Sequence, residues 1–215
     1  HSDMVQSLGK LEINLGKLDL DFASFSGHKI NAPKGIGFMF IKKGNLIEPL
    51  IHGGHQEKGI RSGTENFLGI ISLPVALKLK KDKKKIKKAR DIILNKILEI
   101  PGIKLNGSIT DRIYNNINVS FYGIEGESLL MLLADKGIYI STGSACNSNK
   151  LAESHVLRAI QVDQMYINGS IRLTIDILTE KEIEYVIKSI KSAVKKLQNI
   201  SPFKFKTQLN QRGIK

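Results

Sequence analysis

The sequence contains only one cysteine, Cys146, among its 215 residues. A single cysteine cannot form a disulfide within the chain, which excludes a disulfide-stapled extracellular scaffold. A chain without its own disulfide suits a reducing compartment, so we expect the protein in the cytoplasm, or in the matrix of a mitochondrion or another organelle. The lone thiol is then either an inert core group or a reactive one.

Long hydrophobic runs are also lacking. The longest apolar stretch, residues 67–79, is interrupted by Ser72 and Pro74 and is shorter than a bilayer requires. The sequence therefore predicts no membrane span, no signal peptide and no membrane partner. It begins at His1 rather than Met and opens directly into strand-like and turn-like sequence, so we expect an upstream part to be missing.

Acidic residues are scarce in two segments, which carry the excess positive charge. The formal net charge is +13, and residues 78–90 and 188–215 each carry +8, so the rest of the chain is slightly acidic. A run of like charges is usually a solvated helix face, and nucleic acid is therefore not an expected partner. A basic module for nucleic acid or an acidic partner is the alternative, and it predicts binding that depends steeply on salt.

What is present is a succession of strand and helix patterns in a chain that is 41% hydrophobic, enough to bury a core. Period-two alternation predicts strands at 18–25 and 36–42, and helical spacing predicts one long helix over 67–99, kinked before Pro74. The pattern then predicts, in order, a strand at 117–121, a helix at 127–136, a strand at 138–141, a short helix at 154–160 and a strand at 171–175. A capping box at Thr179 and Glu182 begins the last helix. The expected fold class is α/β.

Lys29 is set apart from the other lysines because it directly follows a predicted strand and the residues Ser26, Gly27 and His28. A pyridoxal-phosphate site needs a lysine amine, a carboxylate for the pyridine nitrogen and donors for the phosphate. Asp3 could supply the carboxylate, and Ser26 and His28 could supply the donors. Judged by spacing alone, a surface lysine at Lys29 and ordinary polar or turn residues at His28 and Asp3 are favoured over a cofactor site.

Cys146 lies in a stretch rich in glycine, serine and asparagine after a predicted strand. A structural cysteine usually lies among apolar residues, whereas an exposed and reactive thiol is typical of a polar loop. A buried, inert side chain is the less favoured alternative.

Four ordered segments carry a resemblance to a known family. They are residues 3–10 (DMVQSLGK), 24–29 (SFSGHK), 61–66 (RSGTEN) and 141–148 (STGSACNS), the last followed by 154–159 (SHVLRA). Together they resemble the cysteine desulfurases of the NifS and IscS type, which are class-V aminotransferase-like enzymes of fold type I that use pyridoxal 5′-phosphate. The similarity runs from residue 1 to about Pro202 and corresponds to the C-terminal portion of the family fold.

The resemblance implies a domain organisation. Residues 1–66 would be the end of the large, cofactor-binding domain of an aspartate aminotransferase-like fold, and residues 67–100 a long connecting helix. Residues 101–200 would form a small α/β domain that carries the catalytic cysteine loop, and residues 201–215 a basic tail.

The resemblance also implies roles for individual residues. These are Lys29 as the Schiff-base lysine, Asp3 at the pyridinium, Gln6 at the ring hydroxyl, Ser26 and His28 at the phosphate, Thr64 at the phosphate of a partner subunit, Arg172 at the substrate carboxylate and Cys146 as the nucleophile. No resident metal is expected, although the resemblance allows Cys146 to ligate an iron–sulfur cluster transiently.

The implied reaction converts L-cysteine to L-alanine and leaves a persulfide on Cys146, which supplies sulfur for iron–sulfur cluster assembly and related transfers. The expected partners are an iron–sulfur scaffold or another sulfur acceptor and a second copy in a homodimer. The family's upstream half has no counterpart here, so a non-catalytic fragment or one half of a split enzyme is an alternative. A selenocysteine lyase would share Lys29 without needing the Cys146 loop.

Overall fold

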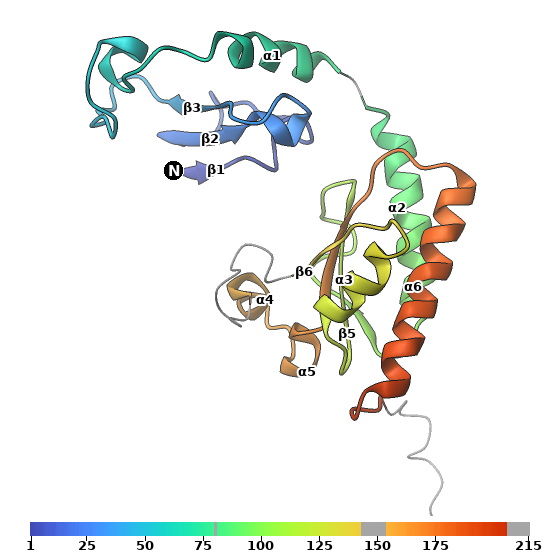
Figure 1. Ribbon diagram of the computed structural model, residues 1–215. Helices are drawn as coiled ribbons and strands as arrows, with labels where there is room; N and C mark the ends of the chain where they lie inside the picture. Colours follow the sequence, from blue (N-terminus) through green and yellow to red (C-terminus); the bar gives the residue numbers. More distant parts are fainter. Residues whose placement is uncertain (80, 143–153, 206–215) are drawn as a thin grey trace, which may run out of the picture. The chain divides into compact units, whose positions relative to one another are not determined.

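The computed structural model describes residues 1–79, 81–142 and 154–205. The chain divides into two compact units, His1–Lys81 and Asp82–Lys215. The division falls inside the segment 67–100, which we expect from the sequence to connect the two domains. Each unit has its own sheet, coloured blue in the first and green to orange in the second (Figure 1).

The first unit is built on a three-stranded sheet in the order β1-β2-β3, with β1 at Ser2–Asp3, β2 at Phe22–Ser26 and β3 at Gly37–Ile41. β1 runs parallel to β2, and β3 pairs with β2 in the antiparallel sense. Along β2, Ala23 and Phe25 are buried while their neighbours are half-buried, as expected for a strand with one face on a core. Two 3₁₀ turns follow, η1 at Gly27–Ile30 and η2 at Gln56–Gly59.

The long helix expected over 67–99 is wrong, because the structure has two helices there: α1 at Phe67–Lys78 and α2 at Lys83–Leu98. Pro74 lies inside α1, and the chain leaves the helix at Leu79, which is extended. The side chain of Asp82 accepts a hydrogen bond from Lys85 N (2.9 Å) and so caps a new helix. The helix breaks here because Asp82 begins a new helix as its N-cap and does not continue α1.

The second unit has a four-stranded antiparallel sheet in the order β4-β5-β7-β6. Its strands are β4 at Ile103–Leu105, β5 at Asn116–Phe121, β6 at Ser141–Thr142 and β7 at Ser170–Thr174. Its helices are α2, α3 at Gly126–Ala134, the short α4 at His155–Ala159 and α5 at Gln164–Ile167, and α6 at Glu180–Ile200. α2 and α3 both pack against α6, and both contact the sheet (Figure 1).

The core of the second unit lies between these helices and one face of the sheet. Alternate residues of β5 and β7 are fully or nearly fully buried in it, among them Ile117, Val119 and Ile171. The residues between them point to the opposite face, which is polar. That polar face is where Arg172 lies.

α6 confirms the helix expected from the capping box. Thr179 Oγ1 accepts from Glu182 N (3.3 Å), and Glu182 Oε2 accepts from Thr179 N (2.7 Å). These bonds satisfy two N–H groups that a helix start leaves unpaired. Among the described helices, none is long and apolar enough to cross a membrane.

Candidate cofactor and substrate sites

The carboxyl ends of β1 and β2 bring four of the expected residues to one edge of the first sheet. Because the strands are parallel and Asp3 is in register with Ser24, Asp3 lies beside the strand that continues into Ser26 and the η1 turn. Ligand sites in such sheets form outside the carboxyl ends of parallel strands. Asp3 Oδ1 accepts from Val5 N (2.9 Å), which orients the carboxylate.

The η1 turn carries Lys29 and His28 on its exposed side. Ser26 Oγ and His28 Nδ1 are 2.8 Å apart, so the two expected phosphate donors form one polar pair. Gly27 N donates to Ile36 O (2.9 Å) and Gly27 O accepts from Ala32 N (3.0 Å), which fixes the turn against the next segment.

Gly27 is required for this turn because of space. A Cβ at position 27 would lie 2.8 Å from Ile36 Cγ2 and 3.0 Å from both Ile36 O and Leu73 Cδ2. Such distances are shorter than van der Waals contact, so a larger residue would push the turn and Lys29 outward. Gly27 thus determines the position of the Lys29 side chain.

Gln6 and Thr64 lie elsewhere in the first unit. Gln6 Oε1 accepts from Lys10 Nζ within the segment after β1, so contact with a cofactor would replace this bond. Thr64 is exposed in the loop after η2, which is held together by Ser62 Oγ donating to Gly54 O (2.7 Å) and Gly63 N donating to Gln56 Oε1 (3.1 Å). No hydrogen bond within residues 1–79 links Thr64 to Asp3, Ser26, His28 or Lys29.

Arg172 is the central residue of β7, not a strand-end arginine, and its side chain is exposed on the polar face of the second sheet. Its strand neighbours in register are Asn118 on β5 and Ser141 on β6. Arg172 Nη2 donates to Ser141 Oγ (3.3 Å), which holds one edge of the guanidinium. A planar guanidinium of this kind suits a carboxylate ligand.

A polar cluster beside Arg172, buried except for the half-buried Asn118, was not expected from the sequence. It consists of Asn106, Asn118, Ser120 and Ser170. Asn106 Nδ2 donates to Asn118 Oδ1 (2.6 Å) and to Ser120 Oγ (2.7 Å). The alternation of polar and apolar residues in NINVS and SIRLT is the signal that could have predicted a polar sheet face.

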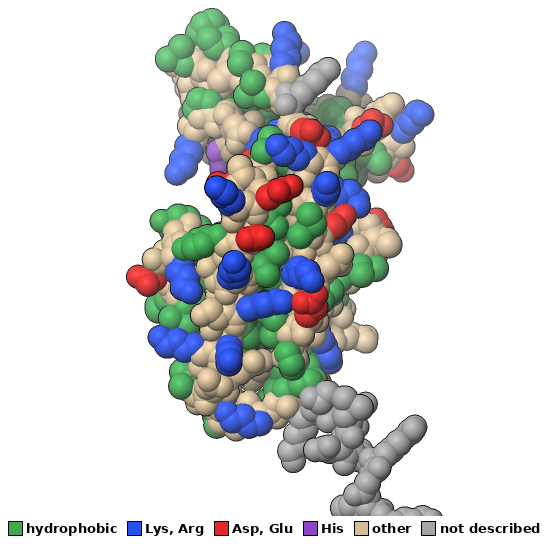
Figure 2. Space-filling model, turned by 90° about the vertical axis from the view of Figure 1, so that its right-hand side faces the viewer, with side chains coloured by type: hydrophobic (Ala, Val, Ile, Leu, Met, Phe, Trp, Pro, Cys, Tyr) green, Lys and Arg blue, Asp and Glu red, His purple; other side chains and the backbone are tan. Residues whose placement is uncertain are grey.

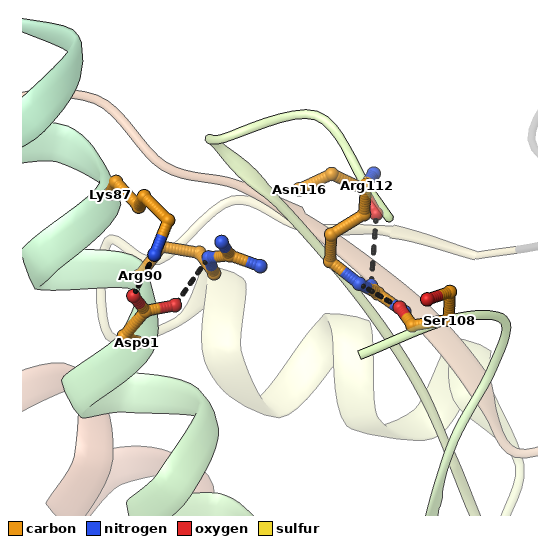
Figure 3. A network of polar contacts seen from close by, with 6 residues as sticks. All are labelled: Lys87, Arg90, Asp91, Ser108, Arg112 and Asn116. Carbon is orange, nitrogen blue, oxygen red and sulfur yellow. Dashed lines mark hydrogen bonds and ion pairs between the residues drawn. The ribbon is translucent and has the colours of Figure 1, made fainter. Parts of the chain in front are cut away.

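Arg112 supports the same face from the loop after β4. It donates from Nε to Ser108 O (2.6 Å) and from Nη2 to Asn106 O (2.7 Å), so it closes the loop that carries Asn106. Arg90 of α2 points toward Arg112 (Figure 3). Burial first, and the positive charge of Arg90 second, lower the pKa of Arg112 below its ordinary value.

The nucleophile expected from sequence, Cys146, lies outside the described residues. The described chain ends β6 at Thr142 and resumes at Ser154, whose Oγ accepts from Leu157 N (3.4 Å) to cap α4.

The lysine run expected as a solvated face is on α2, where the exposed lysines lie opposite the buried residues Ile86, Ile93 and Ile97. Lys87 pairs with Asp91 (2.8 Å), and Lys96 pairs with Glu99 (2.8 Å). Figure 2 shows acidic side chains scattered among the basic ones on this side of the molecule.

Comparison with known proteins identifies relatives along most of the chain. Residues 1–186 match the family described as aminotransferase class-V. Cysteine desulfurase IscS of Methanosarcina thermophila is 46% identical over 208 residues, covering 94% of this chain and 52% of the relative. Cysteine desulfurase IscS of Dictyoglomus turgidum is 41% identical over 220 residues, covering 99% and 56%.

The solved structures that resemble this chain belong to the same group of proteins as its sequence relatives. A NifS-like protein matches with a TM-score of 0.79 at 37% identity, covering 91% of this chain and 52% of its own. The chain thus spans about half the length of the relatives it matches. Enzymes of this family depend on pyridoxal 5′-phosphate and have fold type I, so the expected α/β fold class is confirmed. On these matches, the chain belongs to the class-V aminotransferase family, with cysteine desulfurases of the IscS and NifS type as its homologues.

Proposed function

We propose that this chain forms part of a cysteine desulfurase that converts L-cysteine to L-alanine and passes the sulfur through a persulfide on Cys146 to an iron–sulfur scaffold or another acceptor. The observation that carries the proposal is the placement of Asp3, the Ser26–His28 pair and the exposed Lys29 amine at one edge of a sheet. The names of the homologues support the same activity.

The donor set at this edge fits pyridoxal phosphate. Lys29 Nζ would hold the cofactor covalently, Asp3 would keep the pyridine nitrogen protonated, and Ser26 Oγ and His28 would donate to the phosphate. Gln6 would bind the ring hydroxyl, and Thr64 would bind the phosphate of the partner subunit in a homodimer. When bound, the cofactor supplies an electron sink for the bonds at the substrate Cα.

The remaining chemistry belongs to side chains of this protein. Arg172 would bind the α-carboxylate of L-cysteine, and the Lys29 amine would accept the Cα proton. The Cys146 thiolate would then attack the substrate sulfur, so that an S–S bond forms as the C–S bond breaks. A solved relative, SspA, at 30% identity and a TM-score of 0.66, was determined in complex with cysteine, which supports this substrate.

We include homodimer formation in the proposal. α1 exposes large apolar side chains, among them Phe67 (68%), Leu68 (75%) and Val75 (61%). An apolar surface of this kind is usually covered by protein. The relatives are about twice as long, and we propose that activity needs a counterpart of their unmatched half, on this or another polypeptide. A cytoplasmic location fits such an enzyme.

The cofactor assignment is tested by Lys29→Ala, with Lys34→Ala as the matched control. Both lysines are exposed, and Lys34 lies five residues further along the same segment. We expect the absorption band of the protein-bound cofactor to disappear in Lys29→Ala and to persist in Lys34→Ala. A Lys29→Ala protein with the normal band would contradict the proposal.

Sulfur transfer is tested by Cys146→Ser in the cofactor-loaded protein. This variant should keep the cofactor absorption and lose cysteine-dependent sulfide release, because serine does not accept sulfur as a persulfide. Normal sulfide release would show that another group is the nucleophile.

A further inference from the structure

A row of three polar side chains crosses the second sheet at Arg172. Asn118 on β5 and Ser141 on β6 are both in register with Arg172 on β7. Side chains directly opposed across antiparallel strands have Cβ atoms roughly 5 Å apart. The guanidinium is therefore flanked on both sides within the row.

The Ser141 end of the row restrains Arg172. Because Nη2 donates to Ser141 Oγ (3.3 Å), one edge of the guanidinium is turned toward β6. Within residues 81–142 and 154–205 no other hydrogen bond involves the guanidinium, so its remaining N–H groups can bind a ligand on the exposed side of the sheet, where Arg172 is open to solvent.

The Asn118 end is fixed by the polar cluster beside Arg172. Asn118 Oδ1 accepts from Asn106 Nδ2 (2.6 Å) and from Ser170 Oγ (3.4 Å). Asn106 is itself only 7% exposed and is also held by its bond to Ser120 Oγ (2.7 Å). These bonds fix the plane of the Asn118 amide.

The fixed amide leaves one donor group available. Nδ2 lies on the other side of Cγ from Oδ1, so it is directed away from the cluster. Among the described residues, no hydrogen bond uses Asn118 Nδ2. An asparagine oriented in this way presents two N–H donors beside the guanidinium of Arg172.

We propose that Asn118 Nδ2 is a second donor to the α-carboxylate of the amino-acid substrate, next to Arg172. This inference rests on the proposed role of Arg172 and deepens it. Two donor groups aligned on one strand row select a planar carboxylate, since a ligand without that group leaves both unpaired. Asn118 is thus a specificity residue that discriminates α-amino acids from simple amines.

The test uses Asn118→Ala and Asn118→Asp in the full-length, cofactor-loaded protein. Asn118→Asp keeps the oxygen that accepts from Asn106 and Ser170, so it tests the donor without breaking these bonds, and it also places a negative charge beside Arg172. We expect Asn118→Ala to raise KM for L-cysteine and Kd for L-alanine about 10-fold, the usual size of a lost hydrogen bond to a charged group, with kcat changed less than about 2-fold. Asn118→Asp should raise KM and Kd at least as much, because its negative charge also repels the ligand carboxylate. L-alanine binding is read from the cofactor absorption.

Two comparisons make the result specific. The inhibition constant of cysteamine, which has the amine and thiol but no carboxylate, should stay within about 2-fold in both variants. Asn116→Ala is the matched control, because Asn116 lies on the same strand and face but accepts from Arg112 Nη1 instead (3.4 Å). It should leave KM and Kd unchanged.

Arg172→Ala distinguishes a failure of the Asn118 proposal from a failure of the proposed role of Arg172. If Arg172→Ala does not weaken L-alanine binding, the proposed role of Arg172 fails. If Arg172→Ala weakens binding but Asn118→Ala and Asn118→Asp do not, only the role of Asn118 fails. Equal weakening of cysteamine and L-alanine in the Asn118 variants would also overturn it.

Discussion

Gly27 determines the position of Lys29 because no larger residue fits beside Ile36 and Leu73. We expect Gly27→Ala to lower the free energy of unfolding by about 1–3 kcal/mol, the usual cost of overpacking. The displaced turn should also reduce cofactor occupancy at a fixed cofactor concentration. Both are measured on the full-length protein, by thermal denaturation and by the cofactor absorption.

The control for Gly27 is Gly16→Ala in the same unit. A Cβ at Gly16 would approach only the end of the Asn14 side chain, Oδ1, at 3.3 Å. This variant should keep both stability and occupancy. If Gly27→Ala behaves as Gly16→Ala does, the turn tolerates a side chain and Lys29 is not positioned by this contact.

Arg90 is a second residue whose environment leads to a definite expectation. It is 2% exposed, and its Nε and Nη1 have no hydrogen-bond partner within the described chain. Nε lies 2.9 Å from Asp91 Oδ1, so the charge is paired by distance but without hydrogen-bond geometry. Burying a charge with so few partners is unfavourable.

We therefore expect Arg90→Met to leave the free energy of unfolding unchanged or to raise it, because Met fills the space without a charge. Arg90→Ala should lower it by about 2–4 kcal/mol, because it leaves a cavity. Denaturant unfolding of both variants checks the pair. If Arg90→Met lowers the free energy of unfolding as much as Arg90→Ala does, the guanidinium itself stabilises the fold.

At the scale of elements, Glu99 connects the end of α2 to α6. Its carboxylate binds Lys96 Nζ (2.8 Å) and Lys191 Nζ (2.9 Å). These two ammonium groups, Lys96 first, hold the pKa of Glu99 at about 2, below its ordinary value of 4.5. A group whose pKa is lower in the folded state stabilises the fold above the unfolded pKa, and this contribution is lost as the pH falls through the folded pKa.

The difference in Tm between the wild type and Glu99→Gln should therefore be present at pH 6 and disappear as the pH approaches 2. Because the pair is exposed, the difference should be small and should shrink with added salt. Glu184→Gln is the control, since Glu184 contacts Lys188 at 3.8 Å within α6 alone. A Tm difference that stays constant down to pH 2 would contradict the assignment.

The elements differ in how far the sequence could predict them. α6 and the central strands β5 and β7 were predicted because each has a full apolar period or a capping signal. β4 and α5 were missed because three and four residues are too few for a periodic pattern. The break between α1 and α2 was missed because residues 78–90 were interpreted only as a run of positive charge, and the side chain that caps α2, Asp82, lies within that run.

The candidate sites divide along the same line. The position of Lys29 just past a strand could be predicted because the residues of this turn are consecutive in the sequence, whereas its expected role came from the family resemblance. The row of Asn118, Arg172 and Ser141 depends on the register of three strands that are distant in sequence, so no local pattern reveals it.

At the scale of the whole molecule, the two units differ in the size of their cores. Among its described residues, the second unit has one cluster of 20 buried residues, most of them contributed by its sheet and by α2, α3 and α6. The first unit has two clusters of three buried residues each. Apolar burial is the main favourable term in folding, and small cores rarely offset the lost conformational entropy.

We expect residues 82–215, expressed alone, to fold and to unfold cooperatively on heating, and residues 1–81 to show no cooperative transition. The apolar side chains of α1 that are exposed in the first unit would add to this, because they favour association over folding. Circular dichroism on heating and amide dispersion in NMR spectra of the two fragments check this. The cofactor edge at Lys29 would then depend on protein beyond its own unit for stability, whereas the Arg172 face would form by itself. A cooperative transition in residues 1–81 would show that six buried apolar residues suffice for independent folding. If residues 82–215 alone showed no cooperative transition, the core of the second unit would need the first unit in order to fold.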